Sequence, residues 1–207
     1  MLVTREARWF FDTRPSCWAS PHGEPEIRTD WYAPLADGAS SVKLRSGRLE
    51  AKLRTDEGGP SLVSRWVKFS VAADDGERAN FRRVAERRWI GVKKQRELRH
   101  YDAPSGETLD DPAADSSVQV EWSEVRLLGD PATAWSLSLE APDTVDPEAL
   151  LGLLRVLQEK GLAPRELPAP ESYPEWLRRR AVMNLAGGPA TRESPAAPDH
   201  PSHVLPH

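Results

Sequence analysis

Cysteine and histidine are scarce in this sequence of 207 residues. The single cysteine, Cys17, excludes an internal disulfide and any zinc site built from cysteine pairs. A lone cysteine is typical of a reducing compartment, so we expect a cytoplasmic protein. Three of the five histidines lie close to the C-terminus, at positions 200, 203 and 207. A metal site made of histidines is therefore not expected.

Long apolar runs and an excess of positive charge are also absent. No run of about 18 apolar residues occurs, so we expect no membrane span. The chain has 28 lysines and arginines against 32 aspartates and glutamates, and its formal net charge is −4. Because general nucleic-acid binders are usually basic, we expect no general nucleic-acid binding, and any polyanion site must be local. Phosphate-binding glycine loops, nucleophile elbows and zinc spacings are missing as well.

Alternation of polar and apolar residues is the strongest pattern present, and it predicts antiparallel strands at hairpin spacing. The clearest case is Ser41–Thr55, in which two alternating runs flank a Ser46-Gly47 turn. Other strands are expected at residues 2–12, 26–33, 62–72, 89–101, 118–128 and 134–141. A sheet of about eight such strands can avoid free edges by curling strongly or closing into a barrel.

The period of the pattern changes after residue 141. Asp146 and Pro147 form a helix start, and a stripe of leucines follows until Gly161 ends the helix. A second helix is expected at 172–181, and 74–88 is expected to be a short surface helix or a loop. We therefore predict an α+β protein with one domain over residues 1–182. Its strands lie within 2–141 and its C-terminal helices within about 146–181, and a disordered tail follows at 183–207.

Charged residues recur on one face of strand after strand, opposite an apolar face. They are Glu6, Arg8, Arg28, Asp30, Lys43, Arg45, Glu50, Lys52, Arg54, Lys68, Lys93, Glu121 and Glu140. In an open sheet this face points to water, which suits a protein-interaction platform. In a closed barrel the same face lines the interior, where clustered lysines and arginines are costly unless an anion accompanies them. The alternation alone leaves both arrangements open.

Several of these segments resemble one family. Glu6-Ala7-Arg8, Arg28–Tyr32, Val42–Arg45, Leu49–Arg54 and Val120–Ser123 are similar to the CYTH superfamily, the triphosphate tunnel enzymes. The resemblance implies an eight-stranded antiparallel tunnel that binds a triphosphate, a nucleotide or another polyphosphate, usually with Mg²⁺ or Mn²⁺. It also implies a metal-dependent triphosphatase activity. The chain departs from the family's opening Glu-x-Glu-x-Lys motif, because Arg8 and Phe10 follow Glu6 on that face.

The charge pattern and the resemblance together assign roles to the charged residues. Phosphate contacts are expected from Arg8, Arg28, Lys43, Arg45, Lys52, Arg54, Lys68 and Lys93. Catalytic roles are expected from Glu6, Glu121 and Glu140, and metal ligation from Glu6, Glu50, Glu121 and Glu140, because Mg²⁺ and Mn²⁺ favour carboxylate oxygens. The incomplete motif leaves a second hypothesis, which is a non-catalytic polyanion-binding, nucleotide-binding or protein-interaction module on the same scaffold.

Overall fold

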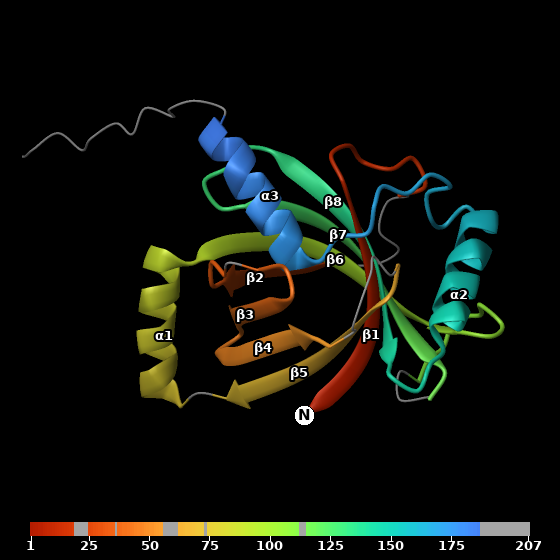
Figure 1. Cartoon of the computed structure of the whole chain (residues 1–207), viewed down its shortest axis with the longest axis horizontal. Helices are drawn as coiled ribbons and strands as arrows, with labels where there is room; N and C mark the ends of the chain where they lie inside the picture. Colours follow the sequence, from red (N-terminus) through yellow and green to blue (C-terminus); the bar gives the residue numbers. More distant parts are fainter. Residues whose placement is uncertain (19–24, 36, 56–61, 73, 112–114, 187–207) are drawn as a thin grey trace, which may run out of the picture.

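The computed structural model describes residues 1–18, 25–35, 37–55, 62–72, 74–111 and 115–186. Within these ranges the chain forms eight strands and three helices (Figure 1). They are β1 (Leu2–Phe11), β2 (Glu26–Tyr32), β3 (Ser40–Arg45), β4 (Arg48–Arg54), β5 (Ser64–Ala72), α1 (Asp75–Arg88), β6 (Ile90–Asp102), β7 (Ser117–Leu127), β8 (Thr133–Pro142), α2 (Pro147–Glu159) and α3 (Tyr173–Ala186). The strands lie where the alternation predicts them. Helix α3 continues past residue 183, where the tail was predicted to begin, and the rest of that tail lies outside the described residues.

The eight strands close into an antiparallel barrel in the order β1-β5-β4-β3-β2-β6-β7-β8. Strands β2 to β5 follow one another around one part of the barrel, and β6 to β8 follow one another around the rest. Strand β1 joins the two groups by pairing with β5 and with β8, and β2 pairs with β6 at the other seam. Closure leaves none of the described strands with a free edge. The predicted α+β barrel is therefore confirmed.

The β3–β4 hairpin has a two-residue turn that fixes its register. Arg45 pairs with Arg48, which leaves Ser46 and Gly47 at the turn with φ values of 45° and 74°. Positive φ at both positions is the conformation of a type I′ turn, whose twist matches that of the flanking strands. This register matters for the interior because a slip of one residue would move every charged side chain of β4 to the other face.

The charged faces of the strands point into the barrel. Glu6 lies opposite Glu140, and Lys52 lies opposite Lys68, in the registers of neighbouring strands. All four side chains line the same internal cavity. The open-sheet arrangement, with this face in water, is therefore wrong. A barrel with such an interior must pair its charges, because unpaired charges in a low-dielectric space are costly.

Helix α2 covers the apolar outer face of one side of the barrel. Buried side chains on that face are Trp9, Val118, Val120, Leu137 and Leu139. The predicted leucine stripe of α2 packs on them, and Leu150, Leu153 and Leu157 are 0% exposed. Figure 1 shows α2 on the outside of the barrel, beyond β1. Each fully buried leucine contributes about 1.5–3 kcal/mol to stability relative to an exposed one. The main hydrophobic core is formed by α2 and the outer face of the strands, and it therefore lies outside the tunnel.

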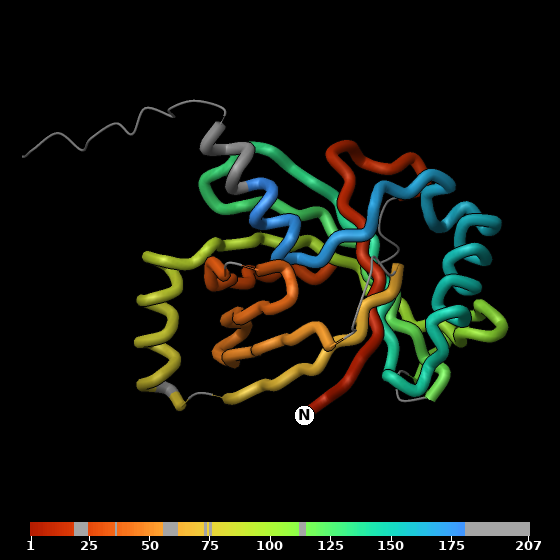
Figure 2. The backbone as a smooth tube through the Cα atoms, in the orientation of Figure 1, coloured from red at the N-terminus to blue at the C-terminus, as the bar shows by residue number. Residues whose placement is uncertain are grey.

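Helix α3 packs over one end of the tunnel. Its Trp176 stacks on Phe10 of β1 with 4.6 Å between the ring centroids, and its Tyr173 stacks on Tyr32 of β2 at 5.3 Å. These rings form a second buried cluster with Val92 of β6. In Figure 2 the chain enters α3 beside the ends of the β2 and β6 segments. Over the residues that the structure describes, no helix combines the length and apolar character needed to cross a membrane.

Candidate functional site

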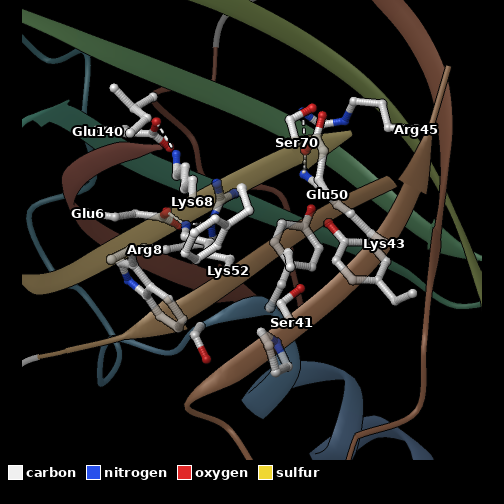
Figure 3. A pocket seen from close by; sticks show the side chains of 18 of the residues that line it. Glu6, Arg8, Ser41, Lys43, Arg45, Glu50, Lys52, Lys68, Ser70 and Glu140 are labelled. Carbon is white, nitrogen blue, oxygen red and sulfur yellow. Dashed lines mark hydrogen bonds and ion pairs between the residues drawn. The ribbon is translucent and has the colours of Figure 1, made fainter. Parts of the chain in front are cut away.

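A cavity of about 520 Å³ occupies the barrel interior, and every strand contributes to its lining (Figure 3). The basic residues that line it are Arg8, Arg28, Lys43, Arg45, Lys52, Lys68, Lys94 and Arg96, and the acidic ones are Glu6, Glu50, Glu121 and Glu140. Asp30, which is 0% exposed, adds a fifth carboxylate because it pairs with three of the basic residues. Eight basic groups thus face five carboxylates, in a volume within the usual range for small-ligand sites.

Like charges lie side by side on two pairs of neighbouring strands, β1 with β8 and β4 with β5. Glu6 lies directly opposite Glu140, and Lys52 lies directly opposite Lys68. Like charges in such positions destabilise a sheet. Each lysine instead reaches past a neighbouring strand to a carboxylate, so that Lys52 pairs with Glu6 and Lys68 pairs with Glu140 (Figure 3). The Lys52 ammonium also lies 4.6 Å from the centroid of the Trp66 ring.

Glu121 is the centre of an arginine cluster. It is 3% exposed, and its carboxylate oxygens lie 3.0 Å from Nη1 of Arg96, 3.3 Å from Nη1 of Arg8 and 3.9 Å from Nη2 of Arg28. Ser123 donates a hydrogen bond to it at 2.9 Å. Burial alone would raise the pKa of Glu121, but the surrounding cations, Arg8 first, hold that pKa well below its usual range. Glu121 therefore stays ionised and positions the guanidinium groups around it.

Asp30, near the C-terminal end of β2, is the centre of a second cluster of charged side chains. Nε and Nη2 of Arg45 donate to its two oxygens at 3.0 and 2.8 Å, and Nζ of Lys94 lies 3.3 Å away. Lys94 also donates to the Tyr32 hydroxyl at 3.1 Å. Burial works against ionisation of Asp30, but Lys94 and Arg45 outweigh it and hold the pKa of Asp30 well below its usual range. A bidentate arginine pair of this kind fixes the orientation of Arg45 at the cavity wall.

Arg28 is held less tightly than the other arginines of the cavity. Its side chain is 12% exposed, and its contacts with Glu26, Asp30 and Glu121 are ion pairs of 3.6–3.9 Å. Its Nε atom is buried without a hydrogen-bond partner in the described part of the chain. A buried donor that makes no hydrogen bond is costly. Because Arg28 also lines the cavity, a small shift of its guanidinium group could bring this donor to an anion there.

Lys43 lines the cavity beside Arg45. Its Nζ lies 3.0 Å from Oε2 of Glu50. Burial, together with the Arg45 charge, lowers the pKa of Lys43 to about 8 despite this pair. Burial likewise lowers the pKa of Lys52. An anion beside these ammonium groups would favour their charged form and raise both pKa values.

The closed antiparallel barrel, with lysine, arginine and glutamate lining its interior from all eight strands, is the arrangement that the sequence resemblance implies. No family model matches the sequence, and no curated protein matches it.

Solved structures that are similar to this chain include three proteins of low sequence identity. One is the PH1012 protein from Pyrococcus horikoshii, with 14% identity over 82% of this chain and 98% of that one and a TM-score of 0.43. HpAC1 from Hippeastrum, a candidate adenylyl cyclase described with a dominant triphosphatase activity, has 14% identity over 90% and 96% and a TM-score of 0.46. The bh2851 protein of Bacillus halodurans, a candidate adenylate cyclase, has 7% identity over 80% and 95% and a TM-score of 0.44. Similarities this distant say nothing about the activity of this chain.

The tunnel brings together most of the residues singled out from the sequence, and two basic residues lie elsewhere. Nη1 of Arg54 lies 3.1 Å from Oε1 of Glu175, so this arginine ties the end of β4 to α3 and is not part of the cavity lining. Lys93 is exposed on the outer face of β6, and Lys94 points inward in its place. Residues that lie directly opposite each other on neighbouring strands point to the same face of the sheet. Arg28 faces the interior and lies opposite Lys94, so Lys94 is the inward residue and the expectation for Lys93 is wrong.

The structure adds cavity residues that the sequence analysis did not select. Lys94 and Arg96 share the inward face of β6, and the register with Arg28 was the signal that could have found them. Tyr173 comes from α3, and its ring centroid lies 3.6 Å from Nζ of Lys94 and 4.7 Å from Cζ of Arg8. No spacing in the sequence indicates that this helix reaches the cavity.

The predicted metal ligands do not converge. Glu6 and Glu140 are neighbours, but each is paired with a lysine, while Glu50 pairs with Lys43 and Glu121 lies among arginines. Over the described ranges, no three His, Cys, Asp or Glu side chains form a group able to hold a metal ion. Mg²⁺ usually keeps several waters and is held by one or two carboxylates together with substrate phosphates, whereas a site made by the protein alone needs more carboxylates. As paired in the described residues, the carboxylates therefore form no site in which the protein alone would hold a resident divalent cation.

Proposed function

We propose that the tunnel binds a small phosphate-rich anion, such as inorganic triphosphate or the triphosphate group of a nucleotide. The observation that carries this proposal is the cross-strand pair Lys52 and Lys68, placed side by side in a closed cavity. Two ammonium groups in neighbouring register positions repel each other, and an anion with several charged oxygens can contact both. A carboxylate has a single negative charge, whereas a triphosphate offers several along one chain.

The rest of the cavity fits the same ligand class. Basic groups outnumber carboxylates there, although the whole chain has a net charge of −4, so the positive potential is local to the tunnel. Arginine forks match phosphate oxygens in bidentate geometry, and Arg28 has one donor, Nε, that the described residues leave without a hydrogen bond. The surplus of basic groups is stable only with negative charge close by, which a bound polyanion supplies.

The prediction from the sequence also includes hydrolysis of the anion. The geometry of the tunnel supports binding more directly than it supports hydrolysis. A general base works best when its pKa lies near the working pH. The pKa values of Glu6 and Glu121 are instead held well below the usual range by the cations around them. We therefore propose binding as the function, and we treat metal-dependent release of phosphate as a separate question for experiment.

Thermal unfolding with and without sodium triphosphate tests the proposal. At ligand concentrations about 100 times the dissociation constant, binding should add about 2.7 kcal/mol of stability and raise Tm by about 5–10 °C. Phosphate release, measured in the same samples with and without Mg²⁺, separates a hydrolase from a binder. An unchanged Tm at saturating triphosphate both with and without Mg²⁺ would contradict the proposal.

Two lysine variants supply the matched comparison. Lys68→Ala removes one ammonium group of the tunnel, whereas Lys93→Ala removes one from the outer face of β6. Each shift in Tm is measured against the same variant without ligand, so any loss of stability from the substitution cancels. We expect Lys68→Ala to lose most of the shift and Lys93→Ala to keep it.

A further inference from the structure

The two acidic residues that lie side by side in the tunnel, Glu6 and Glu140, are the natural start of a metal site, yet the structure uses them differently. Glu6 forms an ion pair with Lys52 of β4, and Glu140 forms one with Lys68 of β5. Oε1 of Glu6 also lies 3.0 Å from Nε of Arg8. The lysines that hold them are the same cross-strand pair that the proposed anion would contact. Carboxylate and anion therefore have the same partners.

We propose, on the basis of the proposed function, that the tunnel binds its phosphate-rich anion without a divalent cation, and that Glu6 and Glu140 compete with the anion for Lys52 and Lys68. In the ligand-free protein the two carboxylates keep the lysines paired. When the anion enters, its oxygens replace the carboxylates as partners of the ammonium groups. The two glutamates thus lower the affinity of the tunnel for the anion, and they do not act as metal ligands.

The charge balance of the cavity supports this reading. Eight basic groups face five carboxylates, so a free divalent cation would enter a space that already has more positive than negative groups. A second cation beside like charges is electrostatically disfavoured, and burial strengthens that effect. A phosphate-rich anion instead meets an excess of basic groups, which offsets much of its charge without a cation.

The hydrogen bonding of Arg28 points the same way. Its buried Nε makes no hydrogen bond within the described residues, and its nearest carboxylate contacts are at 3.6–3.9 Å. A metal ion would not satisfy this donor, because a cation cannot accept a hydrogen bond from the guanidinium group. Arg28 lines the cavity with a side chain that is 12% exposed, so a small shift of its guanidinium group toward an entering anion oxygen would give this donor a partner.

Isothermal titration with sodium triphosphate tests the proposal, once in EDTA and once in MgCl₂. We expect binding in EDTA with an affinity within about threefold of that in MgCl₂, a difference below about 1 kcal/mol. Binding that requires Mg²⁺ would overturn the inference and leave the proposed function standing. Binding in neither buffer would overturn both.

Two glutamine variants distinguish a competitor from a metal ligand. Glu140→Gln removes a partly exposed carboxylate of the tunnel and frees Lys68, so the affinity for triphosphate in EDTA should rise about tenfold. Glu124→Gln removes a carboxylate that pairs with Arg126 on the outer face of the barrel, and it should leave the affinity unchanged. An equal or lower affinity of Glu140→Gln contradicts the competition.

Direct titration with Mn²⁺, followed by the electron paramagnetic resonance signal of the free ion, gives a readout that does not involve the anion. We expect the unliganded protein and Glu140→Gln to take up equally little of the ion. Uptake by the unliganded protein that Glu140→Gln abolishes would identify a metal site and overturn the inference. Unfolding midpoints of the unliganded variants confirm that the comparison is made on folded protein.

Discussion

At the scale of single residues, the protonation of Lys43 should control binding at alkaline pH. Burial and Arg45 lower its pKa to about 8, so Lys43 loses its proton as the pH rises through that value. We expect the affinity for triphosphate to fall about tenfold between roughly pH 7 and pH 9. Isothermal titration across this range measures the effect. Lys43→Arg keeps the charge at all these values and should remove the fall, and an identical pH profile in both proteins would contradict the assignment.

Loss of Glu121, a buried carboxylate of the tunnel, should cost much more stability than loss of a surface carboxylate. Replacement of Glu121 by glutamine leaves Arg8, Arg28 and Arg96 without the anion that holds them together. Removing one partner of a buried ion cluster leaves uncompensated charge and costs about 3–5 kcal/mol. Urea unfolding at neutral pH measures the loss in Glu121→Gln.

The control for that measurement is Glu124→Gln, on the outer face of the same strand. Its carboxylate pairs with Arg126, whose side chain is 57% exposed. Exposed pairs contribute about 0–1 kcal/mol, so this variant should unfold close to the unmodified protein. Equal losses in the two variants would show that the arginine cluster adds no stability beyond a surface pair.

At the scale of elements, the sequence predicts inward and outward faces well where charged and apolar residues alternate cleanly. Strands β3 and β4 are such a case for Lys43, Glu50 and Lys52, because each of these is flanked by aliphatic side chains and the turn fixes the register. Strand β6 is not, since Lys93 and Lys94 are adjacent and either can be the inward residue. Only pairing with β2 decides between them, and that pairing joins residues far apart in the sequence.

Helix α3 shows a second limit of prediction at this scale. The sequence indicates a helix near Tyr173, but its place over the end of the tunnel depends on stacking against rings from β1 and β2. Those contacts follow from closure of the barrel, which local patterns do not specify. The same holds for the paired glutamates and lysines, since each pair spans strands that are not neighbours.

Helix α2 provides a prediction at the scale of elements. Leu153 is 0% exposed against the outer face of the barrel, so Leu153→Ala should lower the free energy of unfolding by about 2–5 kcal/mol. Arg155 is exposed on the same helix, and Arg155→Ala should change stability by less than about 0.5 kcal/mol. Urea unfolding of the two variants makes the comparison, and a similar small change in both would mean that α2 does not form the core described here.

At the scale of the whole molecule, the tunnel ties stability to pH. The pKa values of Glu6, Asp30, Glu50 and Glu121 are all lowered, in each case because nearby lysines and arginines outweigh the effect of burial. In the unfolded chain the same carboxyl groups titrate near pH 4. Protons therefore bind the unfolded chain before they bind the barrel.

The resulting prediction is a loss of stability in acid. The contribution of these carboxylates is complete above about pH 5 and is lost progressively as the pH falls through the lower pKa values of the folded state. The urea midpoint should therefore fall steadily from about pH 5 to pH 3 in ligand-free protein. Because the pairs are buried, about 0.5 M NaCl should screen them little and leave this fall in place. A midpoint that stays constant down to pH 3, or a fall that salt removes, would mean that the interior charges do not hold the barrel together.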